Sequence, residues 1–272
     1  MNEVKKEELV PVRKSLHQAI QLVSAVPRNI LPKDPTDGMS SLEWNAQLES
    51  LESLPVTNDH GEIRVGLKFE TFALYITVDH DSKVALELSG RSVDQGLTWL
   101  KAELAKYDIS SESINLDLPY EIENYDYSKI LQVNNEALTV FGQLYQMTAE
   151  VLADITRKWE EAFDIRCWPH HFDLATLIPL ETDQENEITK SIGIGLSPGD
   201  DGINEPYVYV NIWPQVEVAT LQQHKLAQGD WNTEGWSGAV LPYSQMSETD
   251  HLGKAFEQFT SAVIDILLQE TK

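Results

Sequence analysis

The densest group of chemically versatile side chains lies in residues 166–175, which read RCWPHHFDLA. This stretch holds the one adjacent histidine pair of the sequence, His170 and His171, followed closely by Asp173. Side chains alternate along an extended strand, so His171 and Asp173 would share one face while His170 points to the other. Imidazole nitrogen and carboxylate oxygen bind divalent metals, which makes His171 and Asp173 candidate metal ligands. The spacing matches no specific metal motif, so a metal-free ligand site or a hydrogen-bonded core remains an alternative.

Acidic residues further along the chain could complete such a site from neighbouring strands. Asp200 and Asp201 lie in a glycine-rich stretch, residues 193–202, and Glu205 follows it. A dinucleotide-binding fingerprint would need glycine at position 198, which is Pro198, and a helix immediately afterwards. An acidic turn also repels phosphate, so we expect no nucleotide cofactor.

Aromatic residues accompany a third polar group, residues 231–239, which includes Glu234 and Trp236. Aromatic rings with amide and carboxylate groups are typical of a pocket for a sugar or another small ligand, and equally of a loop that its aromatics fix to a sheet. The Gly-x-Ser-x-Ala spacing around Ser237 comes near a nucleophile elbow. A strand follows it where that motif demands a helix, which disfavours a serine hydrolase.

Two functional hypotheses follow from these groups. In the first, the protein binds a small ligand or a divalent metal, and a metal-bound water performs hydrolysis. The candidate ligand-binding residues are His170, Glu205, Trp213 and Trp236, the candidate metal ligands are His171 and Asp173, and the candidate general bases are Glu234 and Asp200. In the second, the chain is a non-catalytic interaction or scaffold protein whose acidic surface meets a basic partner. The sequence leaves open whether the protein is an enzyme.

The charge balance limits the partners of the chain. Its 272 residues include 20 Lys and Arg against 44 Asp and Glu, a formal net charge of −24. Nucleic acids and anionic membrane surfaces would be repelled, so neither is an expected partner. The single Cys167 excludes a disulfide within the chain and fits a reducing compartment. The sequence contains no apolar signal segment, and we therefore expect a cytoplasmic protein.

Hydrophobic periodicity predicts both helices and strands. The predicted helices cover residues 12–26, 40–54, 92–107, 128–163 and a C-terminal stretch from Ser247, and the predicted strands cover 63–78, 84–88, 172–180, 191–196, 207–213 and 237–243. Residues 111–127 are acidic and read as a solvated crossing segment.

This order of elements predicts an α+β fold, in which antiparallel sheet is covered by helices that include the long one over residues 128–163 and a C-terminal one. Strands that alternate singly with helices, as a doubly wound fold requires, are absent from the pattern. We expect an N-terminal helical extension over residues 1–60 and a single α+β domain over 61–272. Within that domain, residues 61–126 and 164–272 would form two similar strand-then-helix halves.

Four ordered motifs carry a resemblance to a known family: WPHHFDLA at 168–175, LSPGD at 196–200, EPYVYV at 205–210 and GAVLPY at 238–243. Together they resemble an uncharacterised bacterial family catalogued as a domain of unknown function. The resemblance covers roughly residues 60–270. It implies one continuous fold unit with the N-terminal 60 residues as a variable addition, and it implies no reaction, cofactor or catalytic residue.

Overall fold

The chain folds into two compact units, and each is described here by itself. The computed structural model describes residues 6–33, 36–232, 235–247 and 251–271. Unit 1 consists of Met1–Gln146 and Arg166–Phe172, and unit 2 of Met147–Ile165 and Asp173–Lys272. The domain boundary that we expect near residue 60 coincides with no division between these units.

Unit 1 contains an antiparallel sheet with the strand order β7-β1-β2-β4-β5-β6, and β3 pairs with β4. The strands are β1 (Leu42–Asn45), β2 (Ser50–Ser53), β3 (Val56–Asn58), β4 (Gly61–Lys68), β5 (Ala73–Val78), β6 (Asp81–Glu87) and β7 (Arg166–Trp168). Leu51, Leu67 and Leu74 lie opposite one another on adjacent strands and are fully buried. They give the sheet one apolar face.

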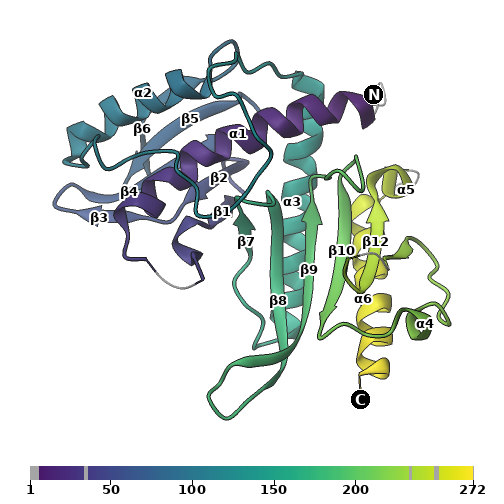
Figure 1. The fold of residues 1–272 in the computed structure, drawn as a ribbon. Helices are drawn as coiled ribbons and strands as arrows, with labels where there is room; N and C mark the ends of the chain where they lie inside the picture. The colour runs from purple at the N-terminus through teal and green to yellow at the C-terminus, as the bar shows by residue number, and fades with distance from the viewer. Residues whose placement is uncertain (1–5, 34–35, 233–234, 248–250, 272) are drawn as a thin grey trace. The chain divides into compact units, whose positions relative to one another are not determined.

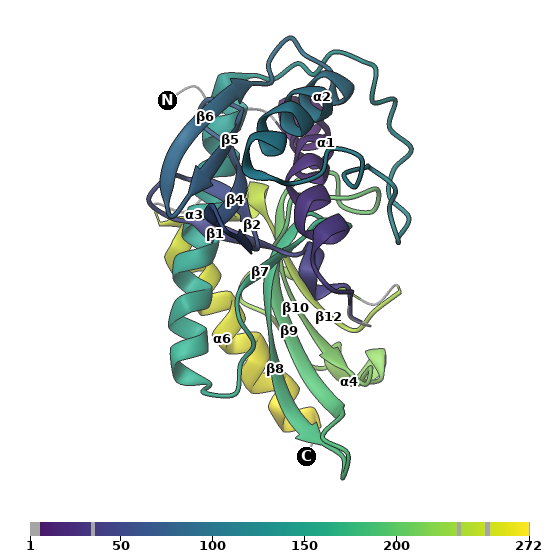
Figure 2. The same cartoon turned by 90° about the vertical axis from the view of Figure 1, so that its left-hand side faces the viewer.

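Two helices cover this apolar face (Figures 1 and 2). Helix α1 (Lys6–Ile30) packs against β2 and β4, and α2 (Val93–Leu104) packs against α1. A capping box begins α2: Gln95 N donates to Ser92 Oγ, and Ser92 N donates to the Gln95 side chain. Short 3-10 turns occupy Gly38–Ser40 and Ala105–Tyr107.

The helix predicted over residues 40–54 is wrong. This stretch forms the β1–β2 hairpin, in which Leu42 lies opposite Ser53 and Trp44 lies opposite Leu51. The apolar residues of this stretch are interspersed with polar ones in a pattern that fits both a helix and a strand. Packing against the neighbouring strand β4 and helix α1 decides the outcome here.

A long segment without regular structure connects α2 to the next helix and runs along α1. We call residues 108–134 the crossing segment. Its contacts with α1 proceed in the reverse direction of that helix: the Asn29 side chain donates to Asn115 O at 3.1 Å, and the Tyr125 hydroxyl bonds to the His17 ring at 3.0 Å. The crossing segment is therefore tied to the middle and to the C-terminal end of α1 by side-chain hydrogen bonds.

The predicted long helix is present as α3 (Asn135–Lys158), shorter at both ends than the 128–163 that we expect. The Asn134 side chain accepts hydrogen bonds from the backbone N–H groups of Glu136 and Ala137 and so fixes the first turn. Residues of α3 up to Gln146 belong to unit 1, and those from Met147 onward belong to unit 2.

Unit 2 contains a second run of antiparallel strands, in the order β11-β12-β10-β9-β8. These are β8 (Asp173–Thr182), β9 (Ile188–Ser197), β10 (Tyr207–Trp213), β11 (Asp230–Asn232) and β12 (Gly238–Pro242). Its helices besides α3 are α4 (Val218–Leu221), α5 (Tyr243–Ser247) and α6 (Leu252–Glu270). Ser247, predicted to cap the last helix, belongs to α5 instead.

The two faces of the unit 2 strands differ in composition. Ile194, Val208 and Val210 are fully buried, and α6 packs against β10 and β12 on this side. Figures 1 and 2 show α6 and the second part of α3 on one side of these strands, whereas α4 lies on the other side. One face is thus helix-covered core, and the other carries polar and aromatic side chains, of which Tyr209 and Asn211 are partly exposed.

The α+β prediction of antiparallel sheet covered by helices is confirmed. Across the described ranges, no helix is both long and apolar enough to cross a membrane.

Candidate functional site

The histidine pair lies in a tight turn of unit 1. The backbone N–H groups of His171 and Phe172 both donate to Trp168 O, and Phe172 adopts a left-handed conformation with φ 57°. His170–Leu174 is therefore not extended at its start, so the condition under which His171 and Asp173 would share one strand face is not met. The buried Phe172 ring packs on Tyr145, whose hydroxyl donates to Phe172 O, and this packing holds a conformation that a non-glycine residue rarely adopts.

Helix α1 holds this turn through Pro169. His17 Nε2 donates to Pro169 O at 2.9 Å, and Gln21 Nε2 donates to the same oxygen at 2.7 Å. Because a carbonyl oxygen only accepts, the His17 proton is on Nε2, and Nδ1 accepts from the Tyr125 hydroxyl. Burial lowers the pKa of His17 to about 4, so its ring is neutral near pH 7.

The two predicted histidines differ in their surroundings. His170 is half-buried, with its ring centroid 5.3 Å from that of Tyr120, and burial together with His171 lowers its pKa. His171 is exposed. The described residues contain no group of three or more His, Cys, Asp or Glu side chains placed to hold a metal ion. A metal site at His171 and Asp173 stays a prediction. The reason for it, that both side chains lie on the same face of one strand, does not hold, because His171 lies in the turn before β8.

Asp173 is the first residue of β8 in unit 2 and belongs to a set of residues on the face of the strands opposite α6. In the strand register, Tyr209 lies opposite Gly195, which lies opposite Ala175. The next row places Asn211 opposite both Gly193 and Gly238. We call this the polar-aromatic face, formed by Asp173, Ala175, Gly193, Gly195, Ser197, Tyr207, Tyr209, Asn211, Trp213 and Gly238, together with Trp236.

Two tyrosine–carboxylate hydrogen bonds lie side by side on the polar-aromatic face. The Tyr209 hydroxyl donates to Asp173 Oδ2 at 2.5 Å, and the Tyr207 hydroxyl donates to Asp200 Oδ2 at 2.6 Å. The two tyrosine ring centroids are 6.4 Å apart. Burial, followed by the hydrogen bond to Asp200, raises the pKa of Tyr207, so this hydroxyl keeps its proton and continues to donate.

Glycine residues on this face have no side chains, so the aromatic rings lie close to the strand backbone. We call these residues the glycine floor. A Cβ at Gly195 would lie 2.8 Å from the Tyr209 hydroxyl and 2.8 Å from Leu174 O. A Cβ at Gly238 would lie 2.6 Å from the Trp236 ring and 2.2 Å from Val210 O. Any larger residue at either position would displace the aromatic side chains.

The structure thus brings together Asp173, Asp200 and Trp236 of the predicted site, because the Trp236 ring meets Tyr209 edge-on with centroids 6.3 Å apart. Trp213 is 60% exposed at the far end of β10. Glu205 is buried and accepts a hydrogen bond from Ser244 N at the start of α5, a structural contact. The predicted general base Glu234 lies outside the described residues.

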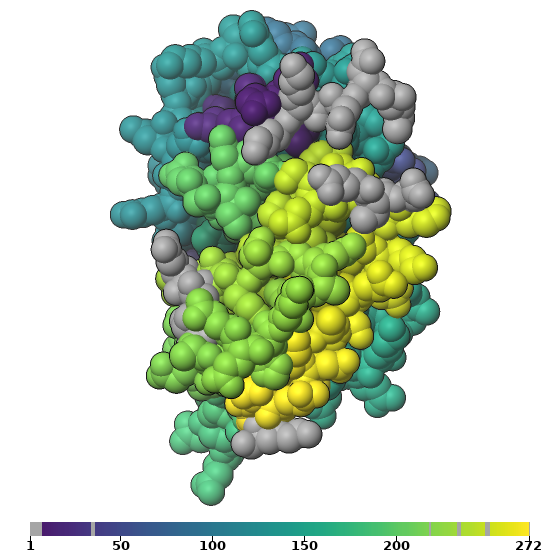
Figure 3. Space-filling view, turned by 90° about the vertical axis from the view of Figure 1, so that its right-hand side faces the viewer, coloured from purple at the N-terminus to yellow at the C-terminus, as the bar shows by residue number. Residues whose placement is uncertain are grey.

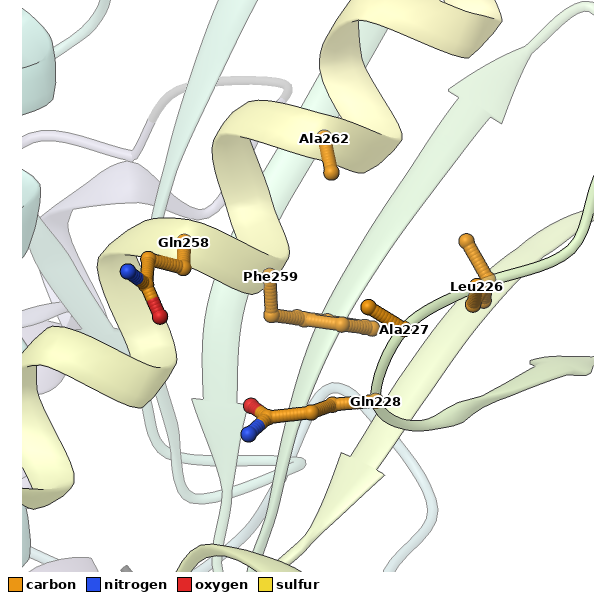
Figure 4. A pocket seen from close by; sticks show the side chains of 6 residues that line it. All are labelled: Leu226, Ala227, Gln228, Gln258, Phe259 and Ala262. Carbon is orange, nitrogen blue, oxygen red and sulfur yellow. The ribbon is translucent and has the colours of Figure 1, made fainter.

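Unit 2 also has a small pocket beside α6, about 180 Å³ in volume. Figure 3 shows this side of unit 2, with α6 in yellow, and Figure 4 shows the pocket lining. Its walls are Leu226, Ala227 and Gln228 before β11, and Gln258, Phe259 and Ala262 of α6. None of these residues is charged, and the pocket contains no group typical of catalysis.

A family model described as "Family of unknown function (DUF5996)" matches residues 1–266. The chain belongs to this family. No curated protein and no solved structure matches the chain. The DUF5996 match begins at residue 1, so α1 with His17 and Gln21 lies inside it, whereas the resemblance in the motifs extends only from about residue 60.

Sequence reasoning did not single out Tyr207 and Tyr209, which organise the polar-aromatic face in this DUF5996 protein. A signal for them exists. In residues 207–213 polar or aromatic side chains alternate with Val and Ile, and in residues 191–197 Ser and Gly alternate with Ile and Leu. Two neighbouring strands with the same alternation predict one core face and one polar face.

Proposed function

We propose that the protein binds a small uncharged ligand rich in hydroxyl groups, of the sugar or polyol class, on the polar-aromatic face of unit 2. The observation that carries this proposal is the adjacent pair of tyrosine–carboxylate hydrogen bonds, Tyr207 to Asp200 and Tyr209 to Asp173, next to Trp236. Carboxylate oxygens accept hydrogen bonds from hydroxyl groups, and aromatic rings offer apolar surface to the C–H side of a sugar ring.

The charge of the face supports an uncharged ligand. Asp173 and Asp200 carry negative charge there, and the residues of the polar-aromatic face include no Lys, Arg or His. An anionic ligand would approach these carboxylates against repulsion, within a chain of net charge −24. The same charge supports our expectation that neither nucleic acid nor membrane is a partner.

A cytoplasmic location belongs to the proposal as well. The single Cys167 is buried at β7 and cannot form a disulfide within the chain, which fits a reducing compartment.

Isothermal titration calorimetry tests the proposal with a panel of glucose, galactose, mannose, xylose, myo-inositol, maltose and cellobiose. We expect saturable binding of at least one of them, weakened roughly tenfold or more in Trp236→Ala and restored in part by Trp236→Phe. Trp231→Phe is the matched control, because Trp231 lies opposite Ala239 and therefore on the other side of the strands. No saturable heat from the panel at millimolar concentration, or equal binding by wild type and Trp236→Ala, would overturn the proposal.

A further inference from the structure

Arg28 is a buried cation in unit 1 whose hydrogen bonds are incomplete. It lies in the last turn of α1 and is 5% exposed. Its Nη1 donates to Ser24 Oγ at 2.8 Å and lies 3.5 Å from the Tyr120 hydroxyl. Its Nε and Nη2 are buried and have no hydrogen-bond acceptor among the residues that the structure describes. A buried guanidinium group without a full set of acceptors costs the folded state free energy.

The two atoms without acceptors form one edge of the guanidinium group. Nε–H and one N–H of Nη2 point in parallel, in the fork that matches the two oxygens of a carboxylate or phosphate. The protein therefore holds one side of the group through Nη1 and supplies no acceptor to the opposite edge from the described residues. This arrangement is what a bidentate oxyanion site requires.

The described groups around Arg28 stabilise its positive charge but accept no hydrogen bond from its Nε–Nη2 edge. No Asp or Glu in the described ranges forms an ion pair with Arg28, although Asp37 attracts it from a longer distance. The carbonyl end of α1 also favours a cation. Tyr120 and Tyr127 are the other titratable groups that face it, and burial raises the pKa of both, so both stay neutral.

The side chains next to Arg28 fix its position before any ligand arrives. The Tyr120 hydroxyl donates to Gln21 Oε1 at 3.2 Å, and Gln21 is held in turn by Pro169 O. Tyr120 also places His170 beside this cluster through their ring contact. Because the guanidinium group is already oriented, a ligand would meet a preorganised fork.

We propose that the Nε–Nη2 edge of Arg28 binds the carboxylate group of a small organic acid. A carboxylate is favoured over a phosphate because Arg28 supplies one positive charge. The second negative charge of a phosphate would face Asp37 without compensation. This inference goes beyond the ligand proposed for unit 2, since it concerns a different class of compound and residues of the other unit.

Thermal unfolding and side-chain NMR together test the proposal, with formate, acetate, pyruvate and phosphate as probes and sodium chloride at matched ionic strength as reference. We expect at least one carboxylate to raise the Tm by a few degrees and to shift the Arg28 Nε–H resonance saturably. Arg28→Lys keeps the charge but lacks the fork, so it should bind the same acid roughly tenfold more weakly. An effect from phosphate alone, or no probe acting beyond chloride, would overturn the proposal.

Arg28→Met separates a ligand-binding role from a structural one. Methionine removes a charge that lacks acceptors, so we expect an unchanged or higher Tm without ligand and no response to the carboxylate. A large loss of stability that acetate does not modulate would show that Arg28 is structural and would contradict the inference. Trp236→Ala should leave the carboxylate response intact, so the failure of either proposal is recognised independently.

Discussion

Tyrosine hydroxyl groups position polar side chains in both units, but the groups around them carry opposite charge. In unit 1, Tyr120 bonds to the neutral Gln21 amide beside the Arg28 guanidinium. In unit 2, Tyr207 and Tyr209 donate to the carboxylates of Asp200 and Asp173. Similar aromatic and hydroxyl surfaces therefore favour different ligands. A buried cation selects an anion, whereas a row of carboxylates selects hydroxyl groups.

The two regions also differ in how they are built. The unit 1 cluster joins residues far apart in sequence, because His17 and Gln21 of α1 hold Pro169. The unit 2 face rests mainly on strand register, with Tyr209 opposite Gly195, and the loop residues Asp200 and Trp236 contact its tyrosines. The stability of unit 1 should therefore depend on the protonation of His17. The stability of unit 2 should depend on the small volume of the glycine residues beneath the aromatic rings.

The largest effect should come from filling the floor of unit 2. Gly238→Ala would place a Cβ 2.2 Å from Val210 O, a backbone atom that cannot move without disturbing the β10–β12 pairing. We expect a loss of about 3 kcal/mol in the free energy of unfolding, measured by urea denaturation. Gly142→Ala in α3 is the matched control, since its Cβ would make ordinary contacts at 3.8 Å and favour the helix. Equal stability of Gly238→Ala and wild type would refute a tight glycine floor.

Acid should destabilise unit 1 through His17. The folded state keeps this ring neutral down to pH about 4, whereas an ordinary histidine takes up its proton at 6.5. Between these values the unfolded chain binds a proton that the folded chain excludes, so stability is highest above pH 6.5 and falls as the pH approaches 4. The full contribution is about 3 kcal/mol. Urea denaturation at successive pH values measures it.

A His17→Leu variant serves as the control for this pH effect. It should be less stable at neutral pH, because the Tyr125 hydroxyl loses its acceptor, and its stability should change less between pH 6.5 and 4 than that of wild type. Parallel pH profiles for the two proteins would exclude His17 as the titrating group.

Removal of a single hydroxyl group in unit 2 should have a smaller effect. Tyr209→Phe deletes the donor to Asp173, a carboxylate that is 8% exposed, and should cost about 2 kcal/mol. The carboxylate response of Arg28 should persist in this variant. Thermal unfolding with and without acetate measures both quantities, and loss of the acetate response would show that the two regions are not independent.

The sequence predicts the elements better than it predicts the sites. The capping-box residues Ser92 and Gln95 indicate the start of α2 from four consecutive residues. The polar and apolar residues of β9 and β10 alternate visibly in the sequence, because side chains of a strand repeat with period two. The turn at His170 could not be anticipated. Its left-handed Phe172 is held by Tyr145, a residue distant in sequence.

For the same reason, Arg28 could not be predicted as a site residue from the sequence. Its burial and its missing acceptors depend on which residues surround it, and Tyr120 of the crossing segment reaches it only in the folded chain. By contrast, the sequence predicts Asp173 as a metal ligand, Asp200 as a general base and Trp236 as a ligand-binding residue, because side-chain type alone suggests these roles. Their arrangement around Tyr207 and Tyr209 required the strand register.

Amide chemical-shift mapping with two ligands tests the central claim most directly, namely that the two regions select ligands of opposite character. Acetate should perturb signals around Gln21, Arg28 and Tyr120. The tightest-binding sugar should perturb signals around Tyr209 and Trp236. Perturbation of the same residues by both compounds, or of neither region by either compound, would contradict the account.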